Sequence, residues 1–219
     1  MVKISHIIGI DEAGRGPLAG PVGVGAVIMS RLHLDKFGCG VIFKKLPNLK
    51  DSKKLSEKQR EVWFEFLKAE KKKGNLDFAV ALVSEKIIDK QGIVKAIKIG
   101  ISRCLKLLLL PTLSRDPDRS VGAIPSNYLV LLDGSLKAPE NFVKQKTIIR
   151  GDESEPIISL ASIVAKVTRD RRMIQLAKKY PNYGFEIHKG YGTKVHYRAI
   201  KKFGLSVIHR QTYCDTNNL

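Results

Sequence analysis

The chain has 219 residues with 39 Lys and Arg against 21 Asp and Glu, so its formal net charge at pH 7 is +18. Hydrophobic residues make up 43% of the chain, enough for a buried core, which excludes a disordered tail protein. The positive charge predicts a polyanionic partner, and a membrane is the weaker choice because the longest apolar stretch, residues 93–110, contains four Lys or Arg. Three cysteines without metal-ligand spacing, and no long apolar segment near the N-terminus, predict a reduced, cytoplasmic protein.

The first half of the chain predicts strands followed by a helix. Residues 4–11 and 22–29 are β-prone and flank a turn with three glycines and two prolines. Residues 31–50 are expected to form an irregular connection. Ser56 and Gln59 form a capping-box pattern, and apolar residues at helical spacing extend that helix to about residue 72. Residues 76–83 are a predicted strand, after which Ser84 could cap a short helix.

The second half alternates helices with strands. Apolar residues recur at helical spacing from Ile93 until Pro111, which is expected to end the helix. A surface loop is predicted over residues 111–127, strands over 128–133 and 147–150, and a helix over 155–179. The tail from residue 180 is predicted to contain short basic helices. This alternation is typical of the α/β class.

Most of the excess positive charge lies in two segments. Residues 166–210 hold twelve Lys or Arg against two acids, and residues 44–73 hold eleven against five. A solvated cationic surface explains either segment alone. Aromatic residues favour nucleic-acid binding for the first of these, because they interleave with its charge as in proteins that bind single strands. They are Tyr180, Tyr183, Phe185, Tyr191, Tyr197 and Phe203.

Acidic residues stand out where they end apolar strands. Asp11 and Glu12 follow one such strand, Asp133 follows another, and Asp170 lies among basic residues on a helix. Any one of them could cap a turn or pair with a base. Together they predict oxygen ligands for Mg²⁺, in a site where two ions would stabilise the attacking and leaving oxygens of phosphodiester hydrolysis. Adjacent strand residues point to opposite faces, so Asp11 and Glu12 share a site only if the chain leaves β geometry near Gly14.

Two further segments could contact a ligand. The glycines of Gly14-Arg15-Gly16 admit close approach of a sugar or phosphate to the backbone, although a structural hairpin loop explains them equally well. Ser52 and Lys53 precede a helix and could bind phosphate, or they could simply form a basic cap.

Six motifs, in order over nearly the whole chain, resemble ribonuclease HII of the bacterial type. They are GIDEAGRGPLAGPV (residues 9–22), DSKKLS (51–56), LLDG (131–134), ASIVAKVTRD (161–170), HKGYGTKVH (188–196) and IHRQTY (208–213).

This resemblance implies a ribonuclease H-like fold with a mixed five-stranded sheet flanked by helices. It implies a catalytic domain over residues 1–179, and a basic helical segment over residues 180–219 packed on that domain. The implied activity is cleavage of the RNA strand of RNA–DNA hybrids, and incision 5′ of single ribonucleotides in duplex DNA that leaves 5′-phosphate and 3′-hydroxyl ends. The implied cofactor is Mg²⁺ or Mn²⁺ in a two-metal mechanism.

The resemblance also assigns residues. Asp11, Glu12, Asp133 and Asp170 would bind metal and act in catalysis. Gly14, Arg15 and Gly16 would read the ribose 2′-hydroxyl through their backbone, Tyr191 would lie against the sugar at the RNA–DNA junction, and Ser52 and Lys53 would hold phosphates. A monomer is expected, and a replication-clamp partner is left open. Two alternatives remain: a non-catalytic basic nucleic-acid-binding protein, and a related two-metal DNA nuclease or resolvase.

Overall fold

Five strands form one mixed sheet in the order β3-β2-β1-β4-β5 in the computed structural model, which describes residues 3–38, 49, 55–113 and 127–214. Neighbours among β1, β2 and β3 pair antiparallel, whereas β4 runs parallel to both β1 and β5. This arrangement confirms the predicted α/β class. The strands are β1 (His6–Ala13), β2 (Val22–Ser30), β3 (Leu76–Val83), β4 (Tyr128–Asp133) and β5 (Gln145–Ile148).

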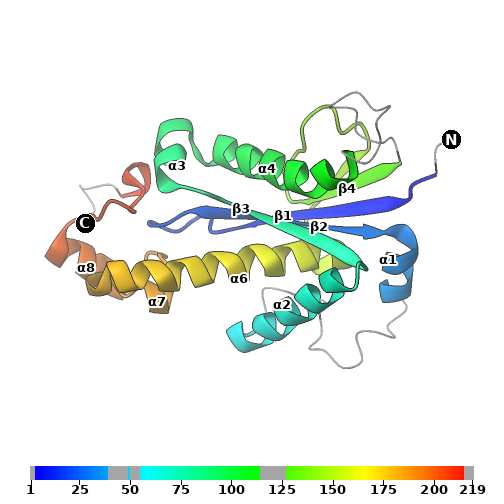
Figure 1. Cartoon of the computed structure of the whole chain (residues 1–219). Coiled ribbons are helices and arrows are strands. Elements are labelled where there is room, and N and C mark those ends of the chain that lie inside the picture. Colours follow the sequence, from blue (N-terminus) through cyan, green and yellow to red (C-terminus); the bar gives the residue numbers. More distant parts are fainter. Residues whose placement is uncertain (1–2, 39–48, 50–54, 114–126, 215–219) are drawn as a thin grey trace.

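Helices cover both faces of the sheet (Figure 1). α3 (Glu85–Gln91) and α4 (Ile93–Leu113) pack on one face, and α2 (Glu57–Lys72) and α6 (Pro156–Lys179) pack on the other. The shorter helices are α1 (Arg31–Gly38), α5 (Gly151–Ser154), α7 (Phe185–His188) and α8 (Lys194–Phe203), with 3₁₀ turns at Pro181–Tyr183 and Gln211–Tyr213. Because side chains alternate along β1, Ile8 and Ile10 enter the core under α4 and Ile7 enters the core under α6.

Glycines let α6 lie close to the sheet. A Cβ added at Gly9 would lie 2.3 Å from the carbonyl oxygen of Ile157, and one added at Gly25 would lie 2.4 Å from that of Ala161. Both distances are far below van der Waals contact, so only glycine fits at these strand positions. The close approach brings the next turn of α6, which carries Ser162, beside the end of β1.

The chain after residue 180 packs on the end of α6 and on the loop between β1 and β2. Tyr183 and Phe185 are buried against Met173 of α6, and an isolated β-bridge joins Ala19 of the loop to His209. These contacts place the last part of the chain directly behind the loop that contains Gly14, Arg15 and Gly16.

The structure differs from the predicted elements in several places. β1 covers His6–Ala13 instead of residues 4–11, so Asp11 and Glu12 lie within the strand. Residues 31–38 form helix α1 instead of an irregular connection, and the oxygen of Ser30 accepts the His33 backbone N–H, a local cap that was not predicted. Pro111 does not end α4, which continues to Leu113, and residues 39–48 and 114–126 lie outside the described part of the chain. β5 begins two residues earlier than predicted. The predicted capping box of α2 is confirmed at Ser56 and Gln59.

No helix in the described ranges is both long and apolar enough to cross a bilayer.

Candidate active site

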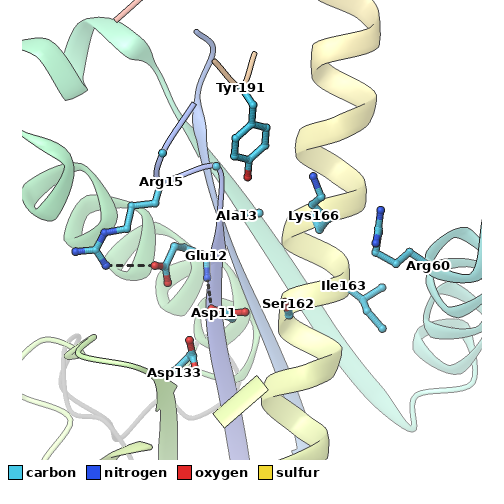
Figure 2. A pocket seen from close by; sticks show the side chains of 12 residues that line it. Asp11, Glu12, Ala13, Arg15, Arg60, Asp133, Ser162, Ile163, Lys166 and Tyr191 are labelled. Atoms are coloured by element: carbon cyan, nitrogen blue, oxygen red, sulfur yellow. Dashed lines mark hydrogen bonds and ion pairs between the residues drawn. The ribbon is translucent and has the colours of Figure 1, made fainter. Parts of the chain in front are cut away.

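A cavity of about 360 Å³ opens at the end of β1, between β4 and α6 (Figure 2). Most of the side chains that line it are charged or polar, and they come from segments far apart in the sequence. The lining residues are Asp11, Glu12, Ala13, Gly14, Arg15, Gly16, Arg60, Asp133, Ser162, Ile163, Lys166 and Tyr191. The structure thus brings together seven of the site residues predicted from the sequence.

The three acids meet because the pairing of β1 with β4 stops early. The last pair in that register is Ile10 with Leu132, so Asp11 and Glu12 extend past the point where β4 accompanies β1. Asp133 ends β4 at the same gap. Both parallel strands therefore direct their C-terminal acids into one opening, where Figure 2 shows them gathered.

Asp11 and Glu12 were expected to share a site only if the chain leaves β geometry, and that expectation is wrong. β1 continues in regular antiparallel pairing with β2 through Ala13, opposite Gly23, so the chain does not leave β geometry. The two carboxylates flank the open edge of β1, and both reach the cavity from their opposite faces. The backbone N–H of Glu12 donates to Oδ1 of Asp11 at 2.7 Å.

Burial and neighbouring charges raise the pKa values of Asp11 and Glu12. The pKa of Asp11 is raised well above its usual value by burial, and then by the charges of Glu12 and Asp133, although a hydrogen bond with the Ser162 side chain opposes the rise. Burial also raises the pKa of Glu12; Arg15, whose Nη1 lies 3.5 Å from Oε1, opposes this effect, and the charge of Asp133 adds to it. The ionised cluster is thus electrostatically unfavourable without a cation.

The donor set fits a hard divalent cation. All three side chains offer carboxylate oxygens, and Oε2 of Glu12 is buried without a hydrogen-bond partner among the described residues. In their present rotamers the acids do not form a coordination sphere, since no three His, Cys, Asp or Glu side chains in the described part of the chain are close enough to hold an ion. All three acids nevertheless line the same cavity.

The fourth predicted acid, Asp170, does not line this cavity. It lies one helical turn beyond Lys166, whose Nζ donates to Oδ1 of Asp170 at 2.9 Å. A different acid, Asp152 of α5, adjoins the cluster: it is fully buried, and its backbone N–H donates to Oδ1 of Asp133 at 3.3 Å. Asp152 was not predicted because no apolar strand leads directly into it. The adjacent Gly151 also lies against Asp133, since a Cβ there would be 3.5 Å from its Oδ1.

The two glycines of the Gly14-Arg15-Gly16 loop have different roles. Gly14 has a φ of +87°, and a Cβ there would lie 1.8 Å from Nε of Arg169, so this position accommodates a protein side chain. A Cβ added at Gly16 would meet nothing within 4 Å. Of the two, Gly16 is the glycine that leaves space for a ligand.

Tyr191 extends over the opposite side of the cavity and is 40% exposed (Figure 2). Cations lie near its ring, with Nζ of Lys166 at 5.7 Å and Cζ of Arg169 at 5.8 Å from the ring centroid. The preceding Gly190 has a φ of +87°, and a Cβ there would lie 2.4 Å from the carbonyl oxygen of Ala19.

Arg60 of α2 also lines the cavity and was not predicted, whereas Ser52 and Lys53 lie outside the described residues.

Part of the predicted aromatic nucleic-acid surface is core. Tyr183 and Phe185 are buried and stack at 5.3 Å between ring centroids. Tyr191, Tyr197 and Phe203 remain partly exposed, at 40%, 42% and 45%. The exposed aromatic surface is therefore smaller than the sequence predicts.

A mixed sheet in this strand order, with acids at the ends of β1 and β4, is the ribonuclease H-like fold. The family model described as ribonuclease HII matches residues 8–216. A ribonuclease HII from Endomicrobium trichonymphae is 43% identical over 213 residues, which are 97% of this chain and 87% of that protein.

Solved structures agree with this assignment. Ribonuclease H2 from Pyrococcus horikoshii OT3 superposes with a TM-score of 0.64 at 26% identity, over 94% of this chain and 93% of that chain. A structure described as Bst-RNase HIII in complex with Mn²⁺ has a TM-score of 0.64 at 19% identity, over 99% of this chain and 70% of that chain, and shares the fold. This chain belongs to the ribonuclease HII family, whose members are endoribonucleases that degrade the RNA of RNA–DNA hybrids.

The raised pKa of Asp11 predicts a stability difference that depends on pH. The folded chain keeps a proton on Asp11 that the unfolded chain loses near pH 4, so folding stability falls as pH rises from there through the folded pKa. Asp11→Asn removes this loss and keeps an oxygen that can accept the Glu12 N–H. In chelator at pH 7, the variant should melt about 3 °C or more above the parent protein.

The quantity to measure is the difference in melting temperature between Asp11→Asn and the parent protein, from pH 4 to pH 8. Three buried histidines have lowered pKa values, which make folding stability rise with pH; they are His188, His196 and His209. Because both proteins contain them, their effect cancels when the two melting temperatures are subtracted. Adding Mg²⁺ should stabilise the parent protein more than the variant. A variant that melts lower at pH 7 in chelator would show that the Asp11 charge is not destabilising.

Proposed function

We propose that this protein is a metal-dependent endoribonuclease that hydrolyses the RNA strand of RNA–DNA hybrids and incises 5′ of single ribonucleotides in duplex DNA. The products would carry 5′-phosphate and 3′-hydroxyl ends, and the role would be ribonucleotide removal during DNA replication and repair. One observation carries the proposal: three repelling carboxylates share a cavity with an open glycine loop and an exposed tyrosine.

Asp11, Glu12 and Asp133 would hold Mg²⁺ or Mn²⁺. When bound, a pair of such cations stabilises the charges of the attacking and leaving oxygens at the phosphodiester. Lys166 and Arg60 line the same cavity and would bind phosphate oxygens of the RNA strand. Burial lowers the pKa of Lys166, and the charge of Asp170 opposes that effect and favours the ammonium form.

Recognition of RNA would depend on the 2′-hydroxyl, which distinguishes it from DNA at a given position. The backbone of Gly14, Arg15 and Gly16 borders the cavity, and the space beside Gly16 admits a sugar. Tyr191 would pack against the sugar on the 3′ side of the ribonucleotide. Ser52 and Lys53 would bind phosphates further along the strand.

The two alternative functions explain less of the site. A non-catalytic binding protein gains nothing from buried acids facing a polyanion, because each acid repels phosphate unless a cation intervenes. A two-metal DNA nuclease needs the acids but has no use for an open glycine beside an exposed tyrosine. A monomeric state and a cytoplasmic location stay predictions.

Asp133→Asn should reduce cleavage about a thousandfold while duplex binding survives or improves. The change removes a cation ligand and also removes a charge that repels the phosphate backbone. The assay uses three duplexes: one with a single ribonucleotide, one with an all-RNA strand paired to DNA, and one made only of DNA. Each is tested with metal and with chelator. The matched control is Asp77→Asn, an acid of β3 that pairs with Lys71 outside the cavity. Turnover near that of the control would remove Asp133 from the site.

A second pair of variants identifies the fourth acid. Asp170 is the residue that the sequence motif selects, whereas Asp152 is the one that adjoins Asp133. Asp152 is a fully buried acid next to Asp133, whereas Asp170 is paired with Lys166. We therefore expect Asp152→Asn, which keeps the backbone contact and removes only the charge, to lower cleavage by about a hundredfold or more and Asp170→Asn to lower it much less. Rates should be measured over a range of Mn²⁺ concentrations, because loss of a ligand also raises the metal concentration required. The reverse ranking would support the motif-based assignment of Asp170.

A further inference from the structure

Two fully buried guanidinium groups lie behind the loop between β1 and β2. Arg210, near the end of the described chain, donates from Nε to the carbonyl of Gly20, from Nη1 to that of Arg15 and from Nη2 to that of Gly14, at 2.9, 2.9 and 2.7 Å. Arg169 of α6 donates from Nε to the carbonyl of Pro21 at 2.9 Å and from Nη2 to that of Lys189 at 3.0 Å. Nη2 of Arg169 also donates to the carbonyl of Ala19 at 3.4 Å, so all six acceptors are backbone carbonyls.

Packing alone does not account for arginine at position 210. Burial, and then the nearby charge of Arg169, lowers its pKa to about 10, so the site disfavours the charge it contains. An apolar side chain would fill the same volume without that cost. The feature that only arginine supplies is a planar fork that can hold several carbonyls in a set orientation.

The bonded carbonyls determine where the neighbouring N–H groups point. In a trans peptide, the C=O of one residue and the N–H of the next point in opposite directions, and the described chain has no cis peptide bond. Arg210 holds the carbonyls of Gly14 and Arg15, so the N–H groups of Arg15 and Gly16 point away from it. Among the described residues, nothing accepts a hydrogen bond from either N–H. Both residues line the catalytic cavity.

We propose that Arg210 is a positioning residue for ribose recognition: its guanidinium orients two peptide planes so that the N–H groups of Arg15 and Gly16 face the substrate. This inference rests on the proposed function, in which that loop reads the 2′-hydroxyl. The buried positive charge behind the peptides also polarises them, which strengthens their N–H groups as donors. Arg169 supports the arrangement, since its side chain fills the space where Gly14 lacks a Cβ.

The backbone around Arg210 is held independently of its side chain. The N–H of Arg210 donates to the carbonyl of Leu18 at 2.7 Å, and the N–H of Gly20 donates to that of Ile208 at 2.8 Å. Arg210 can therefore be substituted without releasing the end of the chain, and we expect its variants to fold.

The test compares binding of two duplexes in EDTA, where no cleavage occurs. One duplex contains a single ribonucleotide, and the other has the same sequence entirely in DNA. Arg210→Met removes all three carbonyl contacts and the charge, and Arg210→Lys keeps the charge but cannot hold the carbonyls of Gly14 and Arg15 together. The control is Arg172→Met, which loses the same charge at an exposed arginine of α6 whose Nη1 contacts Gln175 and not the loop.

The parent protein and the control should prefer the ribonucleotide duplex. In both Arg210 variants, the ratio of the affinity for the ribonucleotide duplex to that for the all-DNA duplex should fall about tenfold. The lysine variant should bind the all-DNA duplex as tightly as the parent protein does. If the preference is unchanged, or if both affinities fall equally, Arg210 does not position the loop and the inference is overturned. A parent protein without any preference would instead contradict the proposed function itself.

Discussion

The early end of the pairing between β1 and β4 is the constraint on which the site depends. A parallel register that stops at Ile10 and Leu132 leaves a gap at the C-terminal ends of two adjacent strands. Asp11, Glu12 and Asp133 all border that gap, and burial keeps solvent from screening their repulsion. The fold tolerates this cluster because hydrophobic packing on both faces of the sheet is extensive. Under the proposed function a bound cation would relieve the repulsion between the ionised acids, so stability and catalysis would be coupled at the same three side chains.

The last part of the chain completes the site from behind. Through the bridge between Ala19 and His209, and through Arg210, it holds the loop whose opposite side forms one wall of the cavity. A hydrogen bond at 2.9 Å joins Nδ1 of His196 to the carbonyl of Tyr191, so the same segment also anchors the exposed tyrosine. Residues 196 positions apart in the sequence, Gly14 and Arg210, thus meet behind one wall of the cavity. The basic C-terminal segment has a structural role in addition to its charge.

The sequence predicted the strands and the acids near their C-terminal ends, because an apolar run followed by a carboxylate is a local signal. It did not predict that β1 continues past Asp11 and Glu12 to Ala13. It did not predict that Asp152 adjoins Asp133, because that contact depends on how β5 and α5 return to the sheet. Asp170 stood out in the sequence because basic residues surround it. In the structure one of those residues, Lys166, forms an ion pair with it. The role of Gly14 was also hidden: its missing side chain makes room for Arg169, a residue 155 positions later, and only tertiary packing reveals such a contact.

The most direct test of the account is calorimetric titration of the protein with Mn²⁺ in two buffers of different ionisation enthalpy, which counts the protons released on binding. Asp11 and Glu12 have raised pKa values, so binding near pH 5 should displace protons from them, and the number released should fall as the pH rises through those values. Asp11→Asn should release fewer protons and bind more weakly. Binding without proton release at pH 5, or binding that Asp11→Asn leaves unchanged, would contradict the claim that these repelling carboxylates form the metal site.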